Sequence, residues 1–134
     1  MKLYEGWSLS FDDRLPIYRQ IILRFNRAFV RGDIMPGDRI PSIRELSAVL
    51  RVNTNTVQRV YQEMERDSII TGRRGTGYYF TEDSKMKEIM RKDLISESVQ
   101  RFVDEMCALG LKNKEILDEL EVYLKGVDGD ESDS

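Results

Sequence analysis

Four short polar residues, Asn53-Thr54-Asn55-Thr56, stand at the start of a segment with the apolar spacing of a helix. Asn53 alone is enough to cap that helix, because its side-chain oxygen can accept a hydrogen bond from a free amide of the first turn. The hydroxyl and amide groups that follow are then free for other partners. Threonine can bond a phosphate or contact a thymine methyl group, asparagine can pair with adenine, and a helix N-terminus favours phosphate. The simplest alternative is a polar helix start that faces only solvent.

The charges of the chain are distributed unevenly. The formal net charge is −3, but residues 1–81 carry 13 Lys+Arg against 9 Asp+Glu, and residues 82–134 carry 8 against 15. Every basic residue of the first part except Lys2 is an arginine, whose planar fork suits phosphates and guanine edges. This pattern indicates that the first part meets a polyanion, although an ordinary solvated surface would explain the charge equally well.

The composition argues against catalysis and metal binding. The chain has no histidine, the commonest general base and metal ligand. No glycine-rich phosphate loop opens a helix, and there is no nucleophile elbow or metal-spaced cluster. We therefore expect no enzyme activity, no catalytic residue, no metal and no cofactor. Cys107, the single cysteine, is expected to be buried and inert rather than a redox sensor.

The sequence also bears on where the protein acts. It has no apolar run near 18 residues and no pattern of a signal peptide. A single cysteine excludes an internal disulfide, which fits a reducing compartment. We expect a soluble, cytoplasmic protein without a membrane partner.

The residues with binding chemistry fall on two short helices and a hairpin. A first helix is predicted from Leu15-Pro16 to Gly32, and a turn-rich connector follows it. Ser42 and Glu45 form a capping box for a second helix that ends near Leu50. A tight Arg51-Val52 turn leads to a third helix over 54–67. The β-prone segments 69–71 and 78–80 flank the basic turn 72–77 and predict a β-hairpin.

The remaining segments are a lead-in and a helical C-terminal part. Residues 1–14 have a hint of alternation at Tyr4, Trp7, Leu9 and Phe11, which favours an extended segment or a packed arm. A long amphipathic helix over 85–109 is followed by Gly110, and Asn113 can cap a last helix. The predicted fold is mainly α, of the α+β kind: an N-terminal arm over 1–14, a winged helix-turn-helix with a β-hairpin wing over 15–82, a two-helix dimerisation region over 83–126, and a disordered acidic tail over 127–134.

Residues 16–81, about half of the chain, resemble the DNA-binding domain of the GntR family of bacterial transcription regulators. The resemblance rests on PIYRQI (16–21), GDIMPGDRIPSIRELS (32–47), VNTNTVQRVYQEME (52–65) and GRRGTGYYF (72–80). The short helical remainder resembles the YtrA-type subfamily, whose members are dimers with a small C-terminal region. The resemblance implies DNA contacts by Arg44, Thr54, Asn55, Thr56 and Gln58, and entry of Arg74 and Gly75 into the minor groove.

The chain departs from the family at two of these positions. Many family members carry arginine where this chain has Thr54 and Gln58, so base readout by those arginines does not carry over. Arg59 is our own candidate for a compensating contact. Arg73, beside Arg74, would lie on the same side of a winged fold as Arg44.

These observations predict a sequence-specific transcriptional regulator that binds double-stranded DNA, most simply a dimeric repressor on a pseudo-palindromic operator. The alternative is a winged-helix protein-interaction module, which has no need of arginines on one face.

A homodimer interface is predicted on the apolar stripe of the C-terminal helices, at Met90, Val99, Phe102, Val103, Met106 and Leu120. This stripe could instead fold onto the winged domain or line a ligand pocket. A small-molecule effector is possible, but nothing in the sequence supports one.

Overall fold

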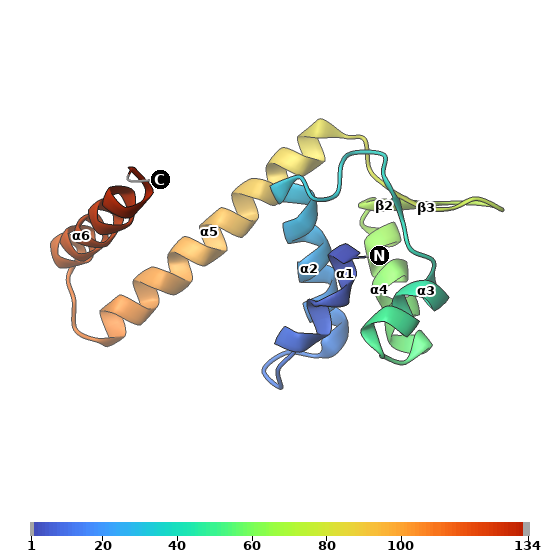
Figure 1. Ribbon diagram of the computed structural model, residues 1–134, viewed down its shortest axis with the longest axis horizontal. Coiled ribbons are helices and arrows are strands. Elements are labelled where there is room, and N and C mark those ends of the chain that lie inside the picture. Colours follow the sequence, from blue (N-terminus) through green and yellow to red (C-terminus); the bar gives the residue numbers. More distant parts are fainter. Residues whose placement is uncertain (1, 133–134) are drawn as a thin grey trace. The chain divides into compact units, whose positions relative to one another are not determined.

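The computed structural model describes residues 2–132, and their side chains as far as residue 127. It divides the chain into two compact units, Met1–Lys92 (unit 1) and Asp93–Ser134 (unit 2). The boundary lies inside helix α5, Ser84–Ala108, rather than at residue 82. The first turns of α5 belong to unit 1, where Met90 is buried and the Lys87 ammonium lies 5.3 Å from the centre of the Phe29 ring. Figure 1 shows the order of the elements.

Three helices form the centre of unit 1: α2 (Ile17–Arg31), α3 (Ile43–Leu50) and α4 (Thr54–Arg66). They place their apolar faces in one core, as the spacing predicted. Gly32 ends α2 in the left-handed conformation, with a φ of 95° that a residue without a Cβ adopts readily. Pro16 is the cap of α2 and not part of its first turn. The fully buried core side chains of these helices are Ile21, Phe25, Phe29, Leu46, Leu50, Val57, Val60, Tyr61 and Met64.

The predicted capping signals position α3 and α4. The Glu45 amide donates to Ser42 Oγ and the Ser42 amide to Glu45 Oε1, both over 3.1 Å, which is the capping box predicted from the sequence. Arg51 closes α3 in the left-handed region with a φ of 56°, and this tight turn leads directly to α4. The Asn55 amide donates to Asn53 Oδ1 over 2.8 Å, so Asn53 caps α4 as predicted.

The predicted hairpin is present and gains a third strand. Strands β2 (Ile70–Arg73) and β3 (Gly77–Phe80) are antiparallel, and Figure 1 shows them as a narrow ribbon that extends away from the helices of unit 1. Strand β1 (Arg39–Ile40) pairs with the other edge of β3, with Arg39 opposite Tyr79. The connector was predicted only as turns, because two residues have no alternation of their own and become a strand through their partner.

The N-terminal segment is helical and packed, so the alternative of an extended segment was wrong. It forms α1 (Lys2–Glu5) and a 3₁₀ turn, η1 (Trp7–Ser10). Tyr4 and Trp7 are buried, and their ring centres lie 5.9 and 5.0 Å from that of Phe25. Burial, with a smaller contribution from the charge of Asp38, raises the pKa of Tyr4 to about 12. These apolar residues follow a helical turn and not the alternation of a strand.

Unit 2 contains the rest of α5 and helix α6 (Asn113–Ser132). Gly110 follows α5 with a φ of 91°. Asn113 is the first residue of α6 and not its cap, while Glu115 accepts a hydrogen bond from the Lys112 amide. The helix includes 127–132, where composition predicted disorder, and residues 133 and 134 of that predicted tail lie outside the described residues. Cys107 is exposed, which corrects the expectation of a buried thiol.

Candidate nucleic-acid interface

The first turn of α4 presents the polar groups that the sequence singled out. Thr54 and Asn55 are exposed and Thr56 is partly buried. Within the described residues, their side chains make no hydrogen bond, because the cap is made by Asn53 alone. Gln58 lies one turn further along the helix and is exposed as well. The start of α4 therefore offers free amide and hydroxyl groups together with the positive end of a helix.

Arg44 lies in the first turn of α3 and is exposed. The adjacent carboxylate of Glu45 is engaged with Ser42, and hydrogen bonds from the Ser42 amide and hydroxyl lower the pKa of Glu45. No ion pair to Arg44 is found in the described part of the chain. Its guanidinium is therefore available to an external anion.

The wing has a fixed base and a basic tip. Glu65 Oε2 on α4 accepts a hydrogen bond of 2.9 Å from the Gly72 amide, which ties the hairpin to the helix. Arg74 and Gly75 form the exposed turn, and Gly75 has a φ of 79° that favours glycine. The Arg73 guanidinium carbon lies 4.4 Å from the centre of the Tyr79 ring. The wing thus carries Arg73 at the end of β2 and Arg74 in the exposed turn.

Arg59 has partners inside the chain. Its guanidinium carbon lies 3.7 Å from the centre of the Tyr18 ring, and its Nε lies 3.5 Å from Glu63 Oε1. A cation over a tyrosine face is stabilised by the ring quadrupole. The predicted DNA contact of Arg59 must compete with these two interactions.

Arg39, which was not among the predicted site residues, also lies at the wing. It lines an open hollow together with the residues of the hairpin turn, Gly72, Arg73, Arg74, Gly75, Thr76, Gly77 and Tyr78. No sequence signal placed Arg39 there, because β1 was not predicted.

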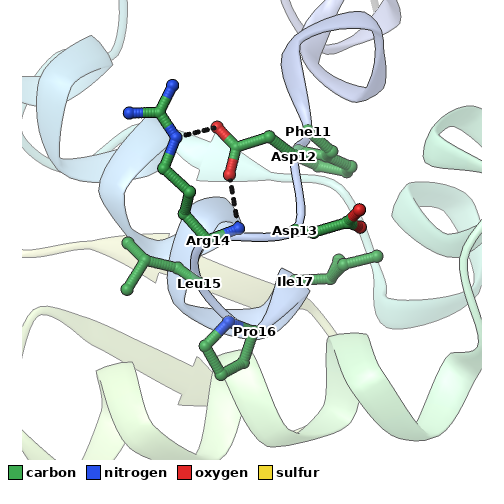
Figure 2. Close-up of a pocket in the computed structure, with 7 residues that line it drawn as sticks. All are labelled: Phe11, Asp12, Asp13, Arg14, Leu15, Pro16 and Ile17. Atoms are coloured by element: carbon green, nitrogen blue, oxygen red, sulfur yellow. Dashed lines mark hydrogen bonds and ion pairs between the residues drawn. The ribbon is translucent and has the colours of Figure 1, made fainter.

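A second hollow, at the loop that leads into α2, contains its own counter-charges. Figure 2 shows the Arg14 side chain directed at Asp12, whose carboxylate also accepts a hydrogen bond of 2.8 Å from the Arg14 amide. The Gln20 side chain bonds the backbone of Asp12 and Leu15. These local bonds hold the loop at the start of α2.

A helix-turn-helix followed by a β-hairpin defines this part of the chain as a winged helix-turn-helix DNA-binding domain. Residues 17–80 match the family described as "Bacterial regulatory proteins, gntR family". The chain is 37% identical over 117 residues to the uncharacterized HTH-type transcriptional regulator YhcF of Bacillus subtilis strain 168, covering 87% of this chain and 97% of that protein. It is 34% identical over 116 residues to the HTH-type transcriptional repressor YtrA of the same organism, covering 86% of each.

A solved structure agrees with these relatives. A GntR family transcriptional regulator from Listeria monocytogenes is 39% identical, with a TM-score of 0.77, over 83% of this chain and 97% of that one. The chain therefore belongs to the GntR family, and it is a transcriptional regulator with a DNA-binding domain. The similarity to YtrA confirms the predicted YtrA-type resemblance.

The family consists of regulators and not of enzymes. Within the described residues, no group of three or more His, Cys, Asp or Glu side chains is placed to hold a metal ion. None of the described helices has the length and apolar character needed to cross a membrane.

Proposed function

We propose that the protein is a dimeric repressor that binds a pseudo-palindromic operator, with α4 in the major groove and the wing tip at the minor groove. The observation that carries this proposal is the first turn of α4, where Thr54 and Asn55 are exposed, Thr56 is partly buried, and none of the three side chains uses its amide or hydroxyl group within the described residues. In helix-turn-helix proteins the N-terminal residues of this helix contact base edges. The similarity to a protein named as a repressor supports repression over activation.

In this proposal, some residues of the domain read the bases and others anchor the domain on the DNA. Asn55 and Gln58 carry amides that can pair with adenine, while Thr54 and Thr56 suit a phosphate or a thymine methyl group. Arg44 and the wing tip at Arg74 anchor the domain on the backbone and in the minor groove. The operator is covered, and access of RNA polymerase is blocked sterically.

Dimerisation is proposed through unit 2, and the structure changes which residues are best suited to it. Met90 is buried within unit 1, and Phe102, Val103 and Met106 are partly buried. Leu117, Leu120 and Leu124 recur along α6 with helical spacing and are exposed, as is Val99 on α5. An apolar stripe of this kind fits a second copy of the same helix across a two-fold axis. The dimer would place two copies of α4 about one DNA turn apart.

The DNA-binding part of this proposal is tested by fluorescence anisotropy over a salt series. The probe is a duplex from the region upstream of the protein's own gene, compared with a scrambled duplex. Arg74→Ala is expected to weaken binding and to reduce the slope of log K against log salt by about 0.9, because one phosphate contact is lost.

Arg31→Ala is the matched control, since it removes the same charge from the end of α2, where Arg31 pairs with Asp33 over 3.6 Å. It should leave the slope unchanged. Equal affinity of the wild type for both duplexes would contradict an operator-binding repressor. An unchanged slope for Arg74→Ala would remove the wing tip from the DNA contact. In vitro transcription from the same upstream region distinguishes repression from activation, since a repressor lowers the yield of transcript and an activator raises it.

A further inference from the structure

We propose that Arg39 and the turn of the wing form a second backbone-phosphate site, beside the turn of the hairpin, in addition to the minor-groove contact of Arg74. This inference rests on the proposed function, because it assumes that the wing lies against DNA. It adds a residue from β1, outside both the helix-turn-helix and the hairpin. The ligand is a phosphodiester oxygen pair, recognised by the guanidinium fork of Arg39.

The backbone that carries Arg39 is fixed on both sides. Arg39 pairs with Tyr79 in the antiparallel β1–β3 ladder. Two residues further on, the Pro41 carbonyl accepts a buried hydrogen bond from the Tyr61 hydroxyl of α4. The short strand is therefore held between the wing and α4, so Arg39 has a defined position relative to both.

The Arg39 side chain lies directly over Gly77. A Cβ added to Gly77 would lie 2.9 Å from Arg39 Nε, closer than real Cβ atoms approach other atoms, and 3.4 Å from Nη2. Gly77 also has a φ of 129°, a backbone conformation that residues with a side chain rarely adopt. The glycine thus leaves the space in which the guanidinium rests against the hairpin.

The surroundings of this guanidinium are basic and have free donors. The hollow has a volume of about 410 Å³ and is lined by Arg39, Arg73 and Arg74 without any acidic residue. Among the described residues, no carboxylate forms an ion pair with these arginines. The charge of Arg39 contributes to the lowered pKa of Glu45, but the Oε1 atom of that carboxylate already accepts a hydrogen bond from the Ser42 amide.

The turn backbone adds to this positive surface. In the described structure the amides of Arg74 and Gly75 donate no hydrogen bond, whereas the Thr76 amide closes the turn on the Arg73 carbonyl over 3.0 Å. Free amides in a turn with a left-handed residue favour anions. Three guanidinium groups and two free amides around one hollow are the chemistry that binds a phosphate, and DNA supplies phosphates on both borders of a groove.

The test is the salt dependence of DNA binding by Arg39→Gln, with Arg39→Lys as the variant that keeps the charge. Arg39→Gln is expected to lower the slope of log K against log salt by about 0.9, and Arg39→Lys to retain the slope. Arg66→Gln is the matched control, because Arg66 pairs with Asp67 at the C-terminal end of α4, away from the N-terminal cap Asn53. An unchanged slope for Arg39→Gln would overturn the site and leave Arg39 as a side chain that only covers Gly77.

A second measurement identifies the individual phosphate that Arg39 contacts. Single phosphates of the duplex are replaced in turn by neutral methylphosphonates, and the wild type and Arg39→Gln are compared on each duplex. Replacing the phosphate that Arg39 contacts should weaken binding of the wild type by the same factor as the Arg39→Gln substitution does. The same replacement should not weaken binding of Arg39→Gln any further. Equal losses for both proteins at every position would overturn the proposal.

Two further outcomes are distinguished by the same proteins. If the wild type binds its upstream duplex and the scrambled duplex equally, the proposed function fails, but the slope of Arg39→Gln on either duplex still tests the phosphate contact. If inorganic phosphate, at constant ionic strength, raises the melting temperature of the wild type but not of Arg39→Gln, and the DNA slope is unchanged, the hollow binds a free anion and the proposal is overturned.

Discussion

At the scale of single residues, the structure separates arginines that the sequence could only count. Arg59 lies on Tyr18 and Arg73 on Tyr79, whereas Arg44 and Arg74 have no ion pair among the described residues. The sequence places Arg59 correctly on the exposed side of α4 but gives no sign of Tyr18, which comes from another helix. Arg59 also has the Glu63 carboxylate as a partner of its Nε, and this ion pair competes with a phosphate.

Arg59→Gln should therefore affect stability more than DNA binding. We expect the free energy of unfolding to fall by about 1 kcal/mol, because a cation–π contact and an exposed ion pair are lost together. The salt slope of DNA binding should stay near the wild-type value. Urea unfolding and the anisotropy series measure the two effects. Tyr18→Leu should show a similar loss of stability, and a slope lowered by about one for Arg59→Gln would instead place its guanidinium on a phosphate.

At the scale of elements, local sequence signals were sufficient in the helix-turn-helix and in the hairpin. The Ser42–Glu45 box, the Asn53 cap and Gly32 set the ends of three helices, and the glycine-rich turn set the hairpin. Strand β1 and the two N-terminal elements, α1 and η1, depend on distant partners and were not predicted. Strand β1 exists through β3, and the N-terminal turns are held by the rings of α2. The same limit hid Arg39, whose neighbours in space are far from it in the chain.

The N-terminal segment should behave as part of the core. Trp7 is 6% exposed, whereas Leu9, in the same turn, is 89% exposed. Trp7→Ala is expected to lower the free energy of unfolding by about 3–5 kcal/mol, the usual cost of deleting a buried aromatic ring. Leu9→Ala, a truncation on the solvent side, should change it by less than about 0.5 kcal/mol. Urea unfolding compares them, and similar small effects would mean that the segment only lies on the surface.

At the scale of the whole molecule, the apolar residues of unit 2 lack enough partners within one chain. Among the described side chains of α6, one apolar residue, Ile116, is buried, while Leu117, Leu120 and Leu124 are exposed. The sequence predicted the stripe but could not tell which of its residues the chain would cover by itself. This distinction moves the proposed interface from Met90 and Phe102 towards α6.

The double variant Leu117→Glu/Leu120→Glu should be a monomer in sedimentation velocity, because it places charges in the proposed apolar contact. Val122→Glu is the matched control on the same helix, since Val122 is 71% exposed and lies on a different face from the leucine stripe. It should leave the dimer intact. The monomer should also lose operator affinity, since one recognition helix replaces two. A dimer that survives the double variant would place the interface elsewhere.

The packing of Trp7 has a practical consequence for spectroscopy. It is the single tryptophan of the chain, and its ring lies edge-on to Phe25 at 5.0 Å in the interior of unit 1. Its fluorescence emission therefore reports the melting of unit 1 alone, whereas far-ultraviolet ellipticity includes the long helices α5 and α6. Two coincident denaturation curves would mean that both units unfold in one cooperative transition. Two separate curves would mean that the C-terminal helices melt independently of the DNA-binding domain.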